Sequence, residues 1–154
     1  MSLVVVRLRG HANRSHRQAL TLDLLRLHYV NHATIVPDNE SYHGMVKKVE
    51  HFVTYGEVSP DTALKLLKER GRAPGNQPLT DAYVAEHTPY GSLEALAAAL
   101  ASGEADLAHL ANIKPVFRLS PARGGLEGNK RHFNEGGSLG YRGEHIAQLI
   151  ERML

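Results

Sequence analysis

Alternation of apolar and polar positions predicts a β-strand near the start of the chain, from Leu3 to Leu8. One face of this strand carries only aliphatic side chains. The other face begins with Val5 and ends with Arg7 and Arg9, so it becomes basic toward its end. Further short apolar runs predict strands at His32–Val36 and at Val53–Glu57, and Pro37 ends the first of these. Pro115–Leu119 is a candidate fourth strand.

A capping box predicts the first helix. Ser15 is followed three residues later by Gln18, which is the pattern in which two side chains satisfy the free amides of a first helical turn. We expect this helix to run to about Leu27, with Leu20, Leu24 and Leu27 as its buried stripe.

Two other helices follow from caps and periodicity. Asn39 can cap a short helix whose lysines, Lys47 and Lys48, point outward. At the end of the chain, apolar residues recur at i, i+3, i+4 and i+7 and predict a closing helix. The predicted inward positions are Met45, Val46 and Val49 in the first of these helices and Ile146, Leu149, Ile150 and Met153 in the second.

Helix signals also fill the middle of the chain. Ser59-Pro60-Asp61 supplies an N-cap, a proline at the first helical position and an early acid, and Gly71 supplies a stop, so a helix is predicted from Pro60 to Arg70. A polar linker, Arg72 to Pro78, comes next. Thr80 and Ser92 then cap two further helices, of which the second is rich in alanine and ends near Gly103.

Charge divides the chain into three parts. The net charge of +2 arises from +3 in residues 1–56, −4 in residues 57–113 and +3 in residues 114–154. Both ends therefore suit an anionic partner, although ordinary enzymes show swings of this size by chance. The chain has 154 residues and is 42% hydrophobic, so we expect one globular unit. We expect its core at residues 1–57, an acidic helical extension at 58–113, and a strand, a basic glycine-rich loop and the closing helix at 114–154.

The segment from Pro121 to Gly143 has an unusual composition. It holds seven of the fourteen glycines, together with Arg123, Lys130, Arg131, His132 and Arg142. No period of 2 or 3.6 organises its few apolar residues, and glycine loses more conformational entropy on ordering than any other residue. We therefore expect this loop to be mobile in the free protein and to be ordered by a polyanion such as RNA, with a flexible lid or linker as the alternative.

Several classes of site are disfavoured. The chain has no cysteine, no leader pattern and no apolar run near the roughly 20 residues of a membrane helix, so we expect a cytoplasmic protein without disulfides or thiolate zinc sites. His28 and His32 straddle the end of a helix and the start of a strand, so their imidazoles would not share a face to bind a metal ion. Glu40 and His43 form one E-x-x-H pair, whereas a di-iron centre needs two such pairs. No metal site, no cofactor and no catalytic residue are predicted.

Two kinds of anion site remain open. The run Gly124–Lys130 resembles a nucleotide cradle but lacks the G-x-x-x-x-G-K-[ST] spacing, so a domain that binds a small phosphorylated ligand is the alternative function. Basic and polar residues also gather after the first strand, where phosphate and 2′-hydroxyl contacts are chemically favoured over base reading. These residues are Arg7, Arg9, His11, Asn13, Arg14, His16 and Arg17. A merely solvated basic face is the alternative there.

Four strings of residues resemble a known family. They are Pro37-Asp38-Asn39-Glu40-Ser41-Tyr42-His43-Gly44-Met45-Val46-Lys47-Lys48-Val49, Phe52-Val53-Thr54-Tyr55-Gly56, Arg123-Gly124-Gly125 and His132-Phe133-Asn134-Glu135-Gly136-Gly137. Together they are similar to the L-thirty family of large-subunit ribosomal proteins, in the long form of archaea and eukaryotes. The resemblance covers essentially the whole chain. Relatives often carry arginine where this chain has His43, which would weaken a phosphate contact at that point.

The resemblance implies an α+β fold and a non-enzymatic role in translation. The fold would be a ferredoxin-like β-α-β-α-β core, with a small antiparallel sheet and two helices on one face, to which the helical insert, the long glycine-rich loop and the C-terminal helix are added. The implied partners are the large ribosomal RNA, neighbouring ribosomal proteins and, as a further candidate, the small (5S-type) ribosomal RNA. No membrane and no small-molecule substrate are expected. The acidic insert is a candidate docking surface for a basic protein.

Pattern and resemblance together give one set of predicted RNA-binding residues. The set is Arg7, Arg9, His11, Asn13, Arg14, His16, Arg17, His43, Lys47, Lys48, Arg118, Arg123, Gly124, Gly125, Lys130, Arg131, His132 and Arg142.

Overall fold

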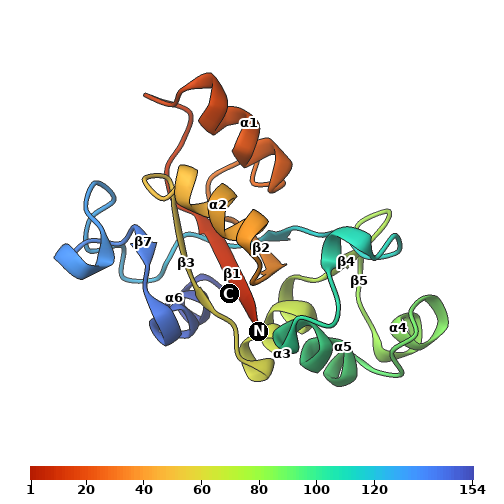
Figure 1. Ribbon diagram of the computed structural model, residues 1–154. Helices are drawn as coiled ribbons and strands as arrows, with labels where there is room; N and C mark the ends of the chain where they lie inside the picture. Colours follow the sequence, from red (N-terminus) through yellow and green to blue (C-terminus); the bar gives the residue numbers. More distant parts are fainter.

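A mixed five-stranded sheet organises the chain, whose computed structural model describes all 154 residues (Figure 1). Its strands are β1 (Ser2–Arg7), β2 (His32–Pro37), β3 (Val53–Glu57), β6 (Phe117–Arg118) and β7 (Gly140–Tyr141), in the order β6-β2-β1-β3-β7. The three long strands form an antiparallel core, as expected. The parallel pairing of β3 with β7 makes the whole sheet mixed, which the sequence did not predict.

Helices cover both faces of this sheet. One face carries α1 (His16–Leu24) and α2 (Glu40–Lys48), and the other carries α3 (Pro60–Arg70), α5 (Leu93–Ser102) and α6 (Ile146–Met153). The predicted α+β class is confirmed, with two helices on one face of the core. The helices of the extension and the closing helix add a third layer on the other face (Figure 1).

The period of 2 in β1 is what lets one strand serve both layers. Val4 and Val6 belong to the larger apolar cluster, under α3, α5 and α6, whereas Leu3 and Val5 belong to the smaller one, under α1 and α2. All four side chains are buried. A strand covered on both faces needs apolar residues at successive positions, which explains the continuous aliphatic run at the start of the sequence.

Local capping signals define the helices well. The capping box of Ser15 and Gln18 is present, Asn39, Ser59, Thr80 and Ser92 each accept a hydrogen bond from a first-turn amide, and Gly103 ends α5 in the left-handed region at φ 89°. The predicted bounds of α3 are confirmed. The apolar stripe of α6 is buried along its whole length. None of the helices has the length and apolar content to cross a membrane.

The predicted stripe of α1 is wrong. Leu20 and Leu24 are 53% and 63% exposed, and Leu22 and Leu25 are buried instead, whereas Leu27 is buried as predicted. Within the helix the buried positions are Thr21 and Leu22, so Leu20 and Leu24 lie on its outer side. The helix ends at Leu24, and the backbone then turns through the left-handed residue Arg26. Leu27 packs from the turn after the helix.

Two short segments also differ from expectation. The predicted polar linker after α3 is a tight hairpin of β4 (Arg72–Ala73) and β5 (Gln77–Pro78), with Gly75 and Asn76 at positive φ in its turn. It leads to α4 (Asp81–His87). The candidate fourth strand is present as β6 but contains only two residues.

The second half of the glycine-rich loop has more structure than predicted. Leu139 is 1% exposed and lies in the larger cluster, and Ser138, Gly140 and Arg142 are also buried. The expectation that nothing within the chain holds this loop is therefore wrong for residues 138–142, which include the two-residue strand β7. Residues 123–131 remain mostly exposed.

Two glycines give opposite predictions for stability. A Cβ at Gly56 would lie 2.1 Å from the carbonyl oxygen of Gly143, so Gly56→Ala forces two backbone segments apart and should destabilise the protein by about 1–3 kcal/mol. Gly44 lies within α2 with nothing within 4 Å, so Gly44→Ala should stabilise it by about 1 kcal/mol. Urea unfolding of both variants measures the two changes. Equal effects at the two positions would contradict the close packing of β3 on the turn before α6.

Candidate nucleic-acid interface

The turn between α2 and β3, residues 49–52, is where the separately predicted basic segments meet. The backbone amides of Leu8 and Arg9 donate to the carbonyl oxygen of Phe52, at 2.9 and 3.2 Å. The Arg9 guanidinium donates to the carbonyl oxygen of His51 at 3.2 Å. From α1, the Gln18 amide donates to the carbonyl oxygen of Lys48 over a longer 3.5 Å. The first loop and the first helix are therefore both fixed to this turn.

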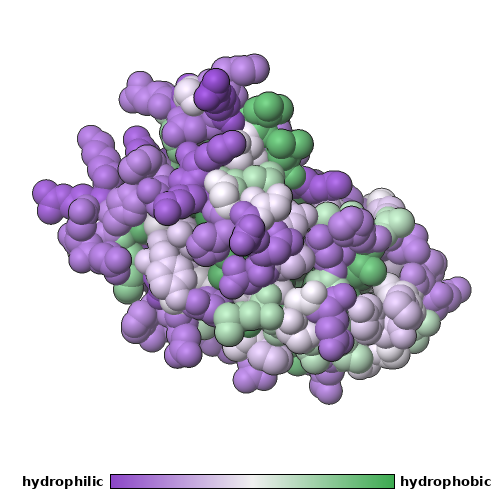
Figure 2. Space-filling view, viewed as in Figure 1, coloured by the Kyte–Doolittle hydropathy of each residue, from purple (hydrophilic) through white to green (hydrophobic).

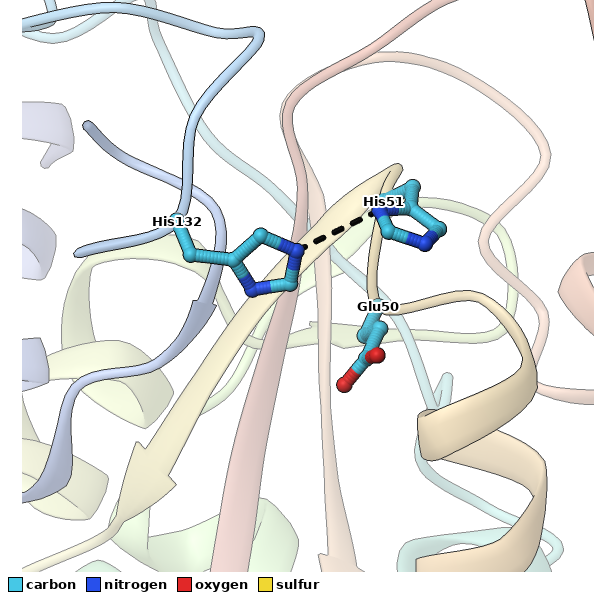
Figure 3. A group of neighbouring side chains, drawn as sticks. All are labelled: Glu50, His51 and His132. Atoms are coloured by element: carbon cyan, nitrogen blue, oxygen red, sulfur yellow. Dashed lines mark hydrogen bonds between the residues drawn. The ribbon is translucent and has the colours of Figure 1, made fainter. Parts of the chain in front are cut away.

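The glycine-rich loop joins the same turn through a pair of histidines. Nε2 of His132 lies 3.2 Å from Nδ1 of His51, with the two rings edge to face (Figure 3). These residues are 81 positions apart, so no sequence pattern could pair them. The contact places the exposed part of the loop beside α2 and the residues that follow β1.

Glu50 lies next to the histidine pair, and the three side chains have ligand atoms within 4.8 Å of one another (Figure 3). This is the group whose donor types and spacing could hold a metal ion. In the structure the two imidazoles are hydrogen-bonded to each other, and this contact explains why the two rings lie close together without an ion. Of the histidines considered in the sequence, His28 contacts Asp23 at 3.3 Å and His43 contacts Asp38 at 3.5 Å, whereas Nδ1 of His32 is buried without a hydrogen-bond partner.

The cations at this end of the molecule have no internal partner. Their side chains form no ion pair and no hydrogen bond within the chain, and most are exposed. These residues are Arg14, Arg17, Lys47, Lys48, Lys130 and Arg131. Hydrophilic side chains extend from α1, α2 and the glycine-rich loop on the face shown in Figure 2. Unpaired, solvated cations of this kind can bind phosphate without first breaking an internal contact.

The start of α1 suits an anion as well. Its first turn contains no acidic residue, and its capping box satisfies only part of the first-turn amides. His16 and Arg17 are exposed there, and His11 and Asn13 are exposed in the loop before it. Asn13 is in the left-handed region at φ 58°, which asparagine tolerates better than most residues.

Arg7 does not lie on the surface, contrary to the sequence prediction. Its side chain is fully buried, and its guanidinium donates to the carbonyl oxygens of Arg9 at 2.9 Å and Leu27 at 2.6 Å. Burial, with the nearby charge of Arg14, lowers the pKa of Arg7. Its role in the structure is to join the turn after β1 to the turn after α1. It positions the basic loop and does not reach solvent.

Arg142 is the second correction. It is 6% exposed and donates to Oγ1 of Thr54 at 2.8 Å and to the carbonyl oxygen of Ser138 at 2.7 Å, and its guanidinium lies over the ring of Phe133. Burial lowers the pKa of Arg142. This arginine fastens the glycine-rich loop to β3.

Tyr141 fastens the same strand from the other side. Its hydroxyl donates to a carboxylate oxygen of Glu57, a hydrogen bond that raises the pKa of Tyr141 to about 12. The strand β7 is therefore tied to β3 by side chains on both sides of its short backbone pairing. The exposed cations of the glycine-rich loop therefore precede a strand whose position is fixed.

Predicted residues in three places lie away from the α2–β3 turn. His43 borders a hollow of about 570 Å³ that Lys47 and two carboxylates, Asp38 and Glu40, also line; His43 itself contacts Asp38, so a phosphate contact of His43 is disfavoured. Residues 123–125 are exposed but lie against α6, where Arg152 donates to the carbonyl oxygens of Arg123 and Gly125. Arg118 lies on β6, at the opposite edge of the sheet from β7.

Known proteins resemble this chain along its whole length. A family model described as ribosomal protein L30p/L7e matches residues 3–53. Large ribosomal subunit protein uL30 of Methanoculleus marisnigri is 49% identical over 149 residues, which cover 97% of each chain. Proteins of the same name from Methanosphaera stadtmanae and Methanobrevibacter smithii are 47% and 46% identical, over 97% and 98% of this chain. The similarity thus extends through the acidic extension and the glycine-rich loop.

Removing Arg142 should loosen the glycine-rich loop and destabilise the fold. Arg142→Ala leaves buried acceptors at Thr54 and Ser138 without their donor, which should cost about 3 kcal/mol. Arg142→Lys should recover little, because an ammonium lacks the fork that reaches both acceptors. Arg123→Ala, in the same loop but exposed, is the control and should change stability by less than about 0.5 kcal/mol. Urea unfolding measures all three, and a tolerated Arg142→Ala would contradict the assigned role.

Proposed function

The chain belongs to the ribosomal protein L30p/L7e family, and from this membership we propose how it holds RNA. It is a structural, non-enzymatic protein of the large ribosomal subunit that takes part in translation and binds ribosomal RNA and other ribosomal proteins. We propose that the cations around the α2–β3 turn bind the phosphate backbone of folded large-subunit RNA. The proposed cations are Arg9, Arg14, Arg17, Lys47, Lys48, Lys130 and Arg131, and the proposed hydrogen-bonding residues beside them are His11, Asn13, His16 and His132.

One observation carries this proposal: the structure joins the three basic segments at one turn. Arg9 and His132 both contact His51, and Gln18 contacts Lys48. Segments more than 80 positions apart in the chain therefore form one surface. Because all of its arginines and lysines except Arg9 lack internal partners, their charge is available to phosphates at little cost in broken contacts.

Recognition of shape and backbone is favoured over reading of bases. An RNA-recognition module exposes paired aromatic rings on the face of its sheet. Here Tyr55 and Tyr141 lie on adjacent strands with ring centres 5.6 Å apart, but Tyr55 is buried beneath the helical layer. Bases cannot stack on a sheet whose two faces are covered, so phosphate and 2′-hydroxyl contacts remain.

The alternative, a domain for a small phosphorylated ligand, has less support. The largest hollow contains two carboxylates, as described above, and its lining has no apolar residue. Small-molecule sites are usually lined mainly by apolar groups with a few convergent polar ones. The full-length similarity to ribosomal proteins agrees with the RNA-binding role instead.

Two finer partner assignments accompany the proposal. The motif resemblance favours contact with the small (5S-type) ribosomal RNA in addition to the large one. We also propose that the acidic extension faces a basic neighbouring protein, because Glu69 and Glu86 are exposed there. Asp81 is exposed too, but its carboxylate accepts from the amide of Leu93 at 2.9 Å, so charge reversal at Asp81 would disturb the fold as well as any docking.

Salt dependence tests the phosphate contacts. If about five phosphates are neutralised, the affinity for transcribed large-subunit RNA should fall with a log-log slope of about −4. Removing two charges in Lys130→Gln/Arg131→Gln should make the slope shallower by about 1.5, because about two fewer counterions are released. Lys65→Gln/Lys68→Gln, which removes two charges from the exposed side of α3 together with the surface ion pair of Lys65 with Glu151, is the control and should keep the original slope.

Filter binding over a range of salt concentrations measures these slopes, and the same titration with small ribosomal RNA tests the second RNA partner. A flat salt dependence of the unmodified protein would overturn the proposal. An equal change in the control variant would show that only net charge matters and that the α2–β3 turn is not the interface.

Amide exchange distinguishes the two halves of the glycine-rich loop. Residues 138–142 should mostly be protected in the free protein, because all of them except Tyr141 are buried and the amides of Ser138, Leu139 and Arg142 donate to backbone oxygens. The mostly exposed residues 126–131 should exchange fast without RNA and slowly with it, because RNA contacts then offset their loss of entropy. Hydrogen exchange by mass spectrometry in both states provides the comparison. Equal protection of residues 126–131 with and without RNA would contradict their role in the interface.

A further inference from the structure

A second cluster of cations surrounds a hollow at the β6 edge of the sheet. The hollow has a volume of about 190 Å³ and is formed by the end of α3, the β4–β5 hairpin and the segment that leads into β6. Its lining residues are Arg70, Arg72, Asn76, Lys114, Val116 and Arg118. Of these six, four are cations and none is acidic. We call it the β6-edge hollow.

No ion pair neutralises Arg72, Lys114 or Arg118. Arg70 donates to the carbonyl oxygen of Arg118, to the backbone oxygen of the last residue, Leu154, and to the hydroxyl of Ser120, at 3.2, 2.7 and 2.7 Å. Arg72 donates to the carbonyl oxygen of Gly71 at 2.8 Å. Carbonyls and hydroxyls orient a guanidinium but leave its positive charge in place. None of the four cations is among the ion pairs of the chain.

Lys114 and Arg118 are the free members of the group. Their side chains make no hydrogen bond within the chain, and Arg118 is exposed. They lie beside Arg70, whose guanidinium is held in a fixed orientation by three acceptors. A fixed cation flanked by two free ones is suited to an anion, because part of the site is already ordered before binding.

Composition did not predict this cluster. Arg70 and Arg72 belong to residues 57–113, which carry a net charge of −4, whereas Lys114 and Arg118 belong to the next part of the chain. The two pairs come together because the amide of Lys114 donates to the carbonyl oxygen of Arg72 at 2.9 Å. The cluster is therefore a local concentration of positive charge beside an acidic part of the chain.

The size and lining of the hollow indicate the class of ligand. Its 190 Å³ is below the range of roughly 300–1,000 Å³ typical of sites for whole small molecules, so it fits phosphate groups better than a nucleotide. Val116 is its only apolar lining residue. An acidic protein partner would need apolar anchors as well as charge, and the hollow offers almost none. Cations with one neutral amide donor are instead the usual contacts of a nucleic-acid backbone.

We propose that the β6-edge hollow holds the phosphate backbone of a second RNA segment, so that the chain connects two parts of the ribosomal RNA across its sheet. This inference rests on the proposed RNA-binding function. The exposed loop at residues 123–131 leads toward β7, and the hollow lies at β6; these are the two edge strands (Figure 1). Four strand spacings of about 4.8 Å separate the edges by roughly 19 Å.

The two surfaces cannot be occupied by the same few nucleotides. Three strands lie between the edges, and helices cover both faces of those strands. An RNA backbone bound at the α2–β3 turn would have to pass around the body of the protein to reach Arg118. Two segments that are separate in the RNA are the simpler occupants, and joining them is a structural role suited to a ribosomal protein.

Binding energetics provide the first test. Lys114→Gln/Arg118→Gln removes the two free cations and leaves Arg70, which holds Ser120 and Leu154, in place. With transcribed large-subunit RNA, we expect an affinity about tenfold lower near 0.1 M salt and a log-log slope shallower by about 1.5. Lys65→Gln/Lys68→Gln again serves as the control. Thermal unfolding followed by circular dichroism verifies that each variant is folded.

Directed cleavage provides the second test. Because the chain contains no cysteine, one cysteine at exposed Gln77, beside the hollow, or at exposed Asn129, in the loop, can carry an iron chelate that cleaves nearby RNA. We expect Gln77→Cys and Asn129→Cys to cleave two runs of nucleotides that are not contiguous. Glu94→Cys, on the exposed side of α5, is the control and should cleave neither run.

The outcomes separate this inference from the proposed function. If the unmodified protein binds RNA and the loop probe cleaves it, but Lys114→Gln/Arg118→Gln binds with wild-type affinity and slope, the second site is overturned and the first stands. Cleavage of one shared run by both probes would overturn the connection between two RNA segments. If a folded hollow variant keeps its RNA affinity but loses a neighbouring acidic protein in reconstituted subunits, the hollow is a protein site. Failure of the unmodified protein to bind RNA would overturn both proposals.

Discussion

The proposed RNA-binding surface depends on two arginines that do not belong to it. Arg7 and Arg142 are buried, and each uses its guanidinium to join a loop or turn to the body of the protein: Arg7 fixes the turn after β1, and Arg142 fixes the glycine-rich loop. A buried guanidinium is costly to desolvate, and acceptors for its donors offset that cost; each of the two arginines has two such acceptors, although Nη2 of Arg7 has none. Carbonyl oxygens at loop ends, which helices and strands leave unpaired, supply such acceptors. The same residue type therefore serves two purposes here, with buried arginines holding the loops and exposed ones remaining free for phosphate.

This arrangement reduces the entropy that RNA must offset. A loop rich in glycine is expensive to order, but the hydrogen bonds of Arg142 and Tyr141 and the burial of Leu139 already order its second half. The contact between His132 and His51 then directs the exposed half toward the α2–β3 turn. Only the residues between these fixed points have to be ordered on binding, so more of the electrostatic attraction is retained as affinity.

Local signals in the sequence predicted the elements well, and contacts between distant residues account for what it missed. Capping residues such as Ser15, Asn39 and Ser59 act within one helical turn, so their pattern is complete in a short window of sequence. The burial of Arg142 depends on Thr54, and the β6-edge hollow depends on α3 meeting the segment before β6, which no local pattern records. Charge pattern and family resemblance assigned Arg7 and Arg142 to RNA, because neither of them shows which arginines the fold buries. The motif resemblance identified the family, since that inference requires only the order of residues.

The layered architecture itself decides where RNA can bind. A two-layer ferredoxin-like core has one open sheet face, on which other RNA-binding modules stack bases. In this chain α3, α5 and α6 cover that face, and their apolar side chains fill it completely. The remaining accessible surfaces are the ends of the sheet, its two edges and the outer sides of the helices. Cations without internal partners lie at one end, around the α2–β3 turn, and at the β6 edge, around the hollow. The acidic extension supplies α3 and α5 of the layer that closes the sheet, beside α6, and it also contributes Arg70 and Arg72 to the hollow. The same addition to the core therefore closes the base-stacking face and forms part of the proposed second phosphate site.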